Sequence, residues 1–241
     1  MRNQFFSDRL GLYWGQMENT QKKNLGADHT DFGHSIKTLW LTYRVGLTIG
    51  DQALVEFAKP RISELIDRAY LPETGSWARG YKKDLTGSRW VLDHDKEWWS
   101  LCELDQTTAT MALVDPAYAA ILPRTYDYWF RYMVDHQHGD VWHMVFAVGN
   151  VPDLTIPKVH SWKNAFHVHE HALVSYLTTQ QLLGKPAKLH YAFKDWPSPA
   201  SVHPYMFLGH FEPGNMRYGE PFAKTGLKHY KAVAISFTGI R

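Results

Sequence analysis

Apolar residues recur at the spacing of amphipathic helices through most of the first 185 positions. Over positions 34–49 they follow i, i+3, i+4 steps, which predicts a helix that ends at Gly50. Pro60 is expected to kink or split a second helix, and Ser161 is expected to cap the last one. The further helices are predicted over about 51–70, 96–113, 116–138 and 162–183.

The connections between these helices are alternately short and long. Residues 71–92 contain three glycines and a proline, so we expect a long loop or a small hairpin there. Positions 141–148 form a strand-like run, and short apolar stretches between Pro and Gly after residue 188 predict a β-rich tail. Helix pairs joined by short turns favour αα-hairpins stacked around an axis, although the sequence has no strict repeat.

Bulk composition is that of a soluble globular protein, with 44% hydrophobic and 21% charged residues among 241. The net charge of +2 gives no argument for a nucleic-acid or membrane partner. No apolar run is long enough for a membrane span, and the N-terminus lacks the apolar stretch of a signal peptide, so a cytoplasmic location is expected. The single cysteine, Cys102, excludes an internal disulfide and a multi-cysteine metal site, and we expect a buried thiol.

Aromatic residues are unusually frequent, at 15% with ten tryptophans. Half of these could lie in the core, but Trp and Tyr also form the walls of sugar sites, where flat pyranose faces stack on rings. Composition alone therefore gives only a weak indication of a carbohydrate ligand.

Two histidines carry the strongest chemical signal. His34 and His167 each lie in an aromatic-rich helical segment, and imidazole titrates near neutral pH. If the fold brings them to one pocket, they could remove a proton and return it without a metal. At helical spacing, Lys37 shares the face of His34, and Glu170 shares the face of His167. The simpler interpretation is that both histidines are hydrogen-bonded structural residues.

A metal site is the weaker interpretation of the His-Val-His-Glu-His segment. His167 and His171 stand at i, i+4 and could bind zinc, but no His-Glu-x-x-His arrangement is present. We therefore predict no metal and no other cofactor.

Three ordered motifs resemble one enzyme family. They are Gly33-His34, Trp98-Trp99-x-x-x-Glu103 and Trp162-Lys163-x-x-Phe166-His167. Together they resemble the N-acyl-D-glucosamine 2-epimerase and cellobiose 2-epimerase superfamily, whose members typically show Gly-His-x-x-Glu, Trp-Trp-x-x-x-Glu and Trp-Lys-x-x-Tyr/Phe-His-x-x-Arg. The resemblance covers roughly residues 25–185.

The resemblance implies an all-α fold of the (α/α)6-barrel, or α/α-toroid, type. It also implies a sugar 2-epimerase or aldose–ketose isomerase in which His34 and His167 act as base and acid. One takes the C2 proton to leave an enediol(ate), and the other delivers a proton to the opposite face. Glu103 would be a polar group of the substrate site, and Trp99 and Trp162 would be its walls.

Two positions depart from the family pattern. Position 37 is Lys where the family usually has Glu, and position 170 is Glu where it often has Arg. Because the two changes have opposite sign, we predict that Lys37 and Glu170 form an exchanged ion pair beside the substrate. The alternative is that these are two unrelated changes.

The chain is short for this family, and the first motif would lie past the middle of a typical member. We therefore expect a partial toroid over residues 1–187, lacking the N-terminal part of the barrel, with a β-rich extension over 188–241 packed on it. Exposed helix faces would then favour a homo-oligomer. Two other functions stay open: a carbohydrate-binding relative without turnover, and a glycoside hydrolase that uses a carboxylate pair such as Asp95 and Glu103.

Overall fold

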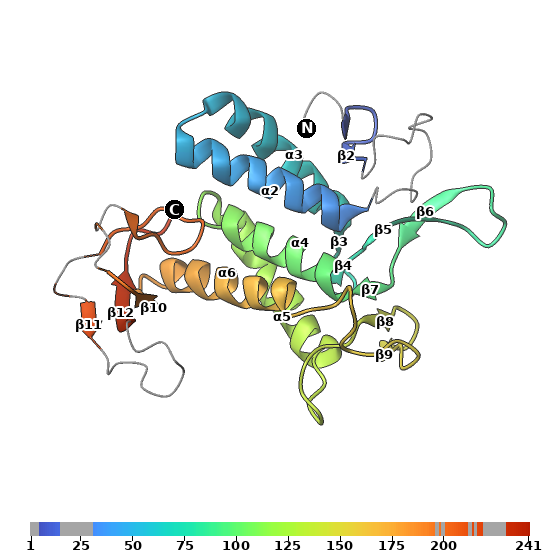
Figure 1. The fold of residues 1–241 in the computed structure, drawn as a ribbon. Helices are drawn as coiled ribbons and strands as arrows, with labels where there is room; N and C mark the ends of the chain where they lie inside the picture. Colours follow the sequence, from blue (N-terminus) through green and yellow to red (C-terminus); the bar gives the residue numbers. More distant parts are fainter. Residues whose placement is uncertain are drawn as a thin grey trace.

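Three helices lie side by side and run in the same direction, with their N-termini at one end of the molecule (Figure 1). They are α2 (Phe32–Ile49), α4 (Trp98–Met111) and α6 (Phe166–Leu182), and α4 contacts both of the others. Helix α3 (Gln52–Ala69) packs against α2, and α5 (Leu122–Tyr128) packs against α4. This computed structural model describes residues 5–14, 31–195, 198, 201–211, 214, 216–218 and 230–241.

Local chemistry sets the helix ends. Asp31 caps α2 by accepting from the His34 amide at 2.7 Å, and Gly50 ends it in a left-handed conformation. Pro60 lies inside α3 without splitting it. The predicted start of α6 at residue 162 is wrong, because the helix begins at Phe166. The Asn164 side chain, and not Ser161, accepts a hydrogen bond from the free Phe166 amide, at 2.9 Å.

The expected helix over 116–138 is three shorter pieces. A 3₁₀ turn, η1 (Pro116–Ala120), precedes α5, and a π-helical turn, η2 (Trp129–Met133), follows it. Pro123 explains the break between η1 and α5, because proline is tolerated in the first turn of a new helix but not inside an existing one.

The prediction of an all-α fold is wrong. The structure is 44% helix and 22% strand, with five small sheets in the part of the chain that it describes. The long connections between helices pair with themselves or, in β7 and β8, with each other, which satisfies backbone groups that a loop would leave unpaired. The strands are β1 (Phe6–Ser7), β2 (Leu12–Tyr13), β3 (Tyr70–Leu71), β4 (Ser76–Trp77), β5 (Gly80–Lys83), β6 (Trp90–Asp93), β7 (Lys96–Glu97), β8 (Met144–Phe146), β9 (Val151–Pro152), β10 (Ala187–Phe193), β11 (Met216–Tyr218) and β12 (Lys231–Phe237).

The sheets follow the chain closely. All of their pairings are antiparallel: β1–β2, β3–β4 and β5–β6 are two-stranded, and β7–β8–β9 and β10–β12–β11 have three strands. The expected hairpin in residues 71–92 is confirmed by β5 and β6, and the expected strand in 141–148 by β8.

Two large hydrophobic cores and a small one, formed by Ala109, Ala112 and Leu122, hold the described elements together. The larger one joins α2, α3 and α4 and includes the fully buried Cys102, as predicted. The second joins Trp40 of α2 and Val174 of α6 to the C-terminal sheet and to Phe207. Phe207 belongs to residues 201–211, which we call the strap. None of the helices in the described residues is long and apolar enough to cross a membrane.

The C-terminal sheet is the β-rich part expected after residue 188. Its core is shared with α2 and α6, so it packs on the helices. Positions 196–197, 199–200, 212–213, 215 and 219–229 of the predicted extension lie outside the described residues. The division into two domains stays a prediction.

Candidate active site

A pocket of about 610 Å³ opens at the N-terminal ends of α2, α4 and α6. Six of the seven site residues expected from the sequence line it, and the seventh, Glu170, contacts Lys37. The structure therefore brings together residues that are 133 positions apart in the chain. The lining residues are Asp31, His34, Lys37, Thr38, Glu97, Trp98, Trp99, Glu103, His143, His160, Trp162 and His167.

Trp99 packs against both predicted catalytic histidines. Its ring centroid is 4.4 Å from that of His34 and 5.8 Å from that of His167, so the two imidazoles are no farther apart than the sum of these distances. Gly33 permits this arrangement, because a Cβ atom built there would lie 2.3 Å from the Trp99 ring. The Gly-His pair thus has a physical reason: the glycine makes room for the indole that contacts the histidine.

The His34 imidazole is held by Asp31. Its Nδ1 lies 2.6 Å from Asp31 Oδ2, and the other Asp31 oxygen caps the helix that carries His34. Burial of the ring lowers the pKa of His34, but the hydrogen bond and charge of Asp31, with the charges of Glu97 and Glu103, outweigh it and raise that pKa above its ordinary value. His34 is therefore biased toward the protonated form.

The His167 imidazole is held by Glu103. Its Nδ1 lies 2.7 Å from Glu103 Oε1, and the Glu103 side chain is fully buried while that of His167 is 29% exposed. A carboxylate on Nδ1 fixes the ring orientation and directs Nε2 away from the carboxylate. Each histidine thus has one nitrogen anchored by an acidic side chain.

A buried charge cluster lies beneath the histidines and consists of Lys37, Glu103, Gln106 and Glu170. The Lys37 ammonium forms an ion pair with Glu170 and lies 3.2 Å from Glu103 Oε2. Gln106 Nε2 donates to Glu103 and, at 3.1 Å, to Glu170. The predicted ion pair between Lys37 and Glu170 is confirmed. Together these residues connect the three helices.

The electrostatics of the cluster depend on its single cation. Burial raises the pKa of Glu170, but its hydrogen bonds to Lys37, Tyr205 and Gln106 outweigh this and lower the pKa. Glu170 therefore contributes stability that is present at neutral pH and is lost as the pH falls through its lowered pKa.

Replacing Lys37 by methionine is expected to destabilise the fold by about 3–5 kcal/mol at pH 7, because two buried carboxylates lose their cation. Glu170→Gln should cost less, since Lys37 keeps Glu103 as its partner. The loss of stability in Lys37→Met should be smaller at pH 5 than at pH 7, because the unpaired carboxylates take up protons. Urea unfolding at both pH values measures these differences.

Arg131→Met is the matched control, because it removes an ion pair with Asp127 in which both side chains are 61% exposed. Its expected cost is small and nearly independent of pH over this range, because solvent screens both charges. A Lys37→Met protein as stable as Arg131→Met would show that the cluster contributes nothing to folding.

The pocket wall includes histidines that the sequence did not indicate. His143 precedes β8 and packs against Trp98 at 4.6 Å between ring centroids, and its Nδ1 lies 2.9 Å from His160 Nε2. Both come from the connection between η2 and α6, which carries no helical periodicity. Trp162 lines the rim and is 86% exposed.

Asp31 could have been recognised as the helix cap that precedes His34.

The other histidines of the His-Val-His-Glu-His segment face different partners. His169 Nδ1 lies 2.8 Å from the Ala165 carbonyl oxygen, and His171 Nε2 lies 3.3 Å from Asp105. Within the described residues, no group of three or more His, Cys, Asp or Glu side chains is placed to hold a metal. The three histidines thus do not converge.

The carboxylate pair considered for a hydrolase is not arranged across this pocket. Asp95 is absent from the lining residues in the described part of the chain, and its oxygens accept from the Ala147 amide and from Lys82. Glu103 lines the pocket, but its two oxygens contact His167 and Lys37. This geometry does not favour glycoside hydrolysis.

Solved structures of sugar-converting enzymes share this fold. A cellobiose 2-epimerase from Bacillus thermoamylovorans B4167 superposes with a TM-score of 0.59 at 18% identity, over 71% of this chain and 42% of that one. A sugar epimerase from a ruminal bacterium gives 0.59 at 20% identity, over 75% and 45%. A D-mannose isomerase gives 0.52 at 18% identity, over 65% and 39%.

The chain spans less than half of the length of each of these three structures. No protein-family model matches the sequence, and a search of curated proteins finds no match. The resemblance drawn from the three sequence motifs is confirmed at the level of the fold. The chain has part of the α/α-toroid-like fold of the sugar epimerase and isomerase structures.

Proposed function

We propose that the protein is a sugar 2-epimerase or aldose–ketose isomerase that uses His34 and His167 for proton transfer. One observation carries the proposal. Two imidazoles line one pocket against a shared indole, and each has its Nδ1 anchored by a carboxylate. Such a pair suits removal and return of a proton on carbon, and the fold is shared with enzymes named for that chemistry.

The anchoring assigns a role to each histidine. The raised pKa of His34 suits the general acid, because the ring is protonated more readily than a free imidazole. His167 is then the base that takes the C2 proton of the open-chain sugar. The electron pair passes to the carbonyl oxygen, which gives an enediolate. A proton from His34 at C2 on the opposite face gives the epimer. A proton at C1, together with passage of the O2 proton to O1, gives the ketose.

The helix layer supports this intermediate. The N-terminal ends of α2, α4 and α6 meet at the pocket, and helix N-termini carry a partial positive charge. An anionic enediolate would be stabilised there more than a neutral sugar, which is the requirement for lowering the barrier. Trp99 gives a flat apolar surface on which a sugar could stack.

Incubation with mannose, glucose, N-acetylglucosamine and cellobiose in D₂O tests the proposal. We expect deuterium at C2 of at least one sugar, with the epimer or ketose accumulating, as followed by NMR at C1 and C2. The solvent deuteron enters because a histidine exchanges its proton with water between abstraction and return. Release of glucose from cellobiose without deuterium at C2 would instead indicate hydrolysis.

A second function, sugar binding without turnover, is favoured by one observation. Lys37 and Glu170 form their ion pair with charges reversed from the family pattern, directly beneath the histidines. Saturable binding by calorimetry with no deuterium uptake in any of the sugars would support this function over the enzyme. A homo-oligomer stays a prediction, which sedimentation would measure.

A further inference from the structure

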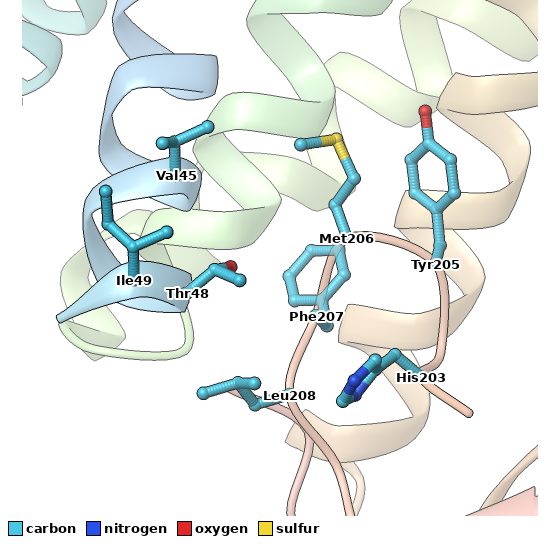
Figure 2. A pocket seen from close by; sticks show the side chains of 8 residues that line it. All are labelled: Val45, Thr48, Ile49, His203, Tyr205, Met206, Phe207 and Leu208. Atoms are coloured by element: carbon cyan, nitrogen blue, oxygen red, sulfur yellow. The ribbon is translucent and has the colours of Figure 1, made fainter. Parts of the chain in front are cut away.

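The strap, residues 201–211, crosses the helix layer on the side of the charge cluster away from the histidines. Figure 2 shows Met206, Phe207 and Leu208 facing Val45 and Ile49 of α2, with Tyr205 extending separately beside α6. The Tyr205 hydroxyl donates to Glu170 Oε1 at 2.5 Å. A residue that is 35 positions from Glu170 in the chain thus reaches the cluster on which His167 rests.

The strap is held firmly on the C-terminal side of Tyr205. Arg44 is 1% exposed and donates to the Met206 carbonyl at 2.8 and 3.1 Å and to the Arg241 carbonyl at 2.9 Å. Its guanidinium lies 4.3 Å from the centre of the buried Phe207 ring. Leu208 and Arg241 exchange two backbone hydrogen bonds of 3.0 Å. These contacts fix the position from which Tyr205 extends.

The Tyr205 backbone adopts a conformation that tyrosine rarely takes, with φ at 60°. Such a conformation persists only where the surroundings hold it, here through the anchored Met206 and Phe207. The phenol also stays protonated, because burial and the neighbouring Glu170 raise the pKa of Tyr205. The hydroxyl is therefore a fixed donor.

We propose that Tyr205 is a positioning residue of the sugar site, which holds Glu170 so that Lys37 and Glu103 keep His167 in its working orientation. The inference rests on the proposed function for its effect on turnover. Its physical content is a connected set of contacts: Tyr205 to Glu170, Glu170 to Lys37, Lys37 to Glu103, and Glu103 to His167. The C-terminal segment thereby becomes part of the support of the active site.

Removal of the Tyr205 hydroxyl should change the charge balance of the cluster in a predictable direction. Without its donation, Glu170 draws Lys37 more strongly, and Glu103 loses part of its compensating charge. Glu103 of α4 contacts His167 directly, and Lys37 and Glu170 lie behind it in the chain of contacts. The other ionisable side chains that line the same pocket are Asp31, His34, Glu97, His143 and His160. A less compensated Glu103 attracts the His167 Nδ1–H more strongly, so the surroundings of the His167 ring should change.

The test compares Tyr205→Phe with Tyr191→Phe. Tyr191 donates its hydroxyl to the His203 carbonyl of the strap at 3.0 Å but does not reach the cluster, so its variant controls for loss of a strap contact. The ring signals of His167 are followed by NMR without sugar and are assigned by their absence in His167→Ala. We expect these signals to move in Tyr205→Phe and to stay unchanged in Tyr191→Phe.

Turnover and a double variant complete the test. With an active sugar, Tyr205→Phe should lower kcat about tenfold with little change in KM. Combined with Glu170→Gln, the Tyr205→Phe change should have no further effect. Unchanged His167 ring signals in a folded Tyr205→Phe protein would overturn the inference. Shifted ring signals in a protein that exchanges no deuterium would overturn the proposed function instead.

Discussion

His167→Ala and His34→Ala are each expected to lower epimerisation by about 10²–10⁴-fold, the usual contribution of a positioned acid or base. The two variants should differ in deuterium exchange. Without the base His167, the C2 proton is not removed and exchange is lost as well. Without the acid His34, the proton can still leave and a deuteron can return to the same face, so exchange persists without epimerisation. NMR of the sugar in D₂O separates the two outcomes.

His169→Ala is the matched control for these variants. His169 lies on the same helix, two residues from His167, but its ring caps the Ala165 carbonyl and does not line the pocket. Its exchange rate should stay within a few-fold of the unmodified protein. Unaltered epimerisation in His167→Ala would refute the assignment of this residue, whatever the behaviour of His34→Ala.

Gly33→Ala is expected to reduce turnover about 100-fold, because a displacement of about 1 Å in a positioned group has effects of that size. The added Cβ would lie 2.3 and 2.7 Å from two atoms of the Trp99 ring, so the indole must move away from its position beside the two histidines. Stability should fall by up to about 2.5 kcal/mol. The gain of about 0.5–1 kcal/mol from replacing a helical glycine opposes a repacking cost of about 1–3 kcal/mol.

Gly46→Ala provides the comparison on the same helix. Its Cβ would meet Leu54 and Val55 at 3.0 Å and lies far along α2 from the pocket lining. We therefore expect a modest stability change and normal turnover. Kinetics with thermal unfolding of both proteins measures the contrast, and equal turnover in the two variants would show that Trp99 needs no fixed position.

The sequence predicted the helices because their apolar faces are long and periodic. Helix α3 and the site helices α2, α4 and α6 were all expected, with errors of a few residues at their ends. The fold class was wrong because strands of two to four residues, such as β3 and β7, carry too few positions for alternation to be recognised. Their pairing is set by the connections that bring their ends together.

The candidate site was predictable where it lies on helices. Helical spacing placed Lys37 with His34 and Glu170 with His167, and their opposite charges predicted the contact that the structure shows. His143 and Tyr205 were not predictable, because each reaches the site from a non-periodic segment. No local pattern could indicate that a tyrosine from the strap would donate to Glu170.

Because three helix ends converge at one pocket, the histidines with their carboxylate partners and the outer residues of the pocket wall come from different kinds of segment. The imidazoles and their carboxylate partners belong to, or directly precede, helices buried in the core, whereas His143, His160 and Trp162 come from the connecting segments. If the proposed function holds, substitution or lengthening of those segments would change which sugar is admitted while the proton-transfer geometry is preserved. Selectivity in this architecture can therefore diverge without rebuilding its chemistry.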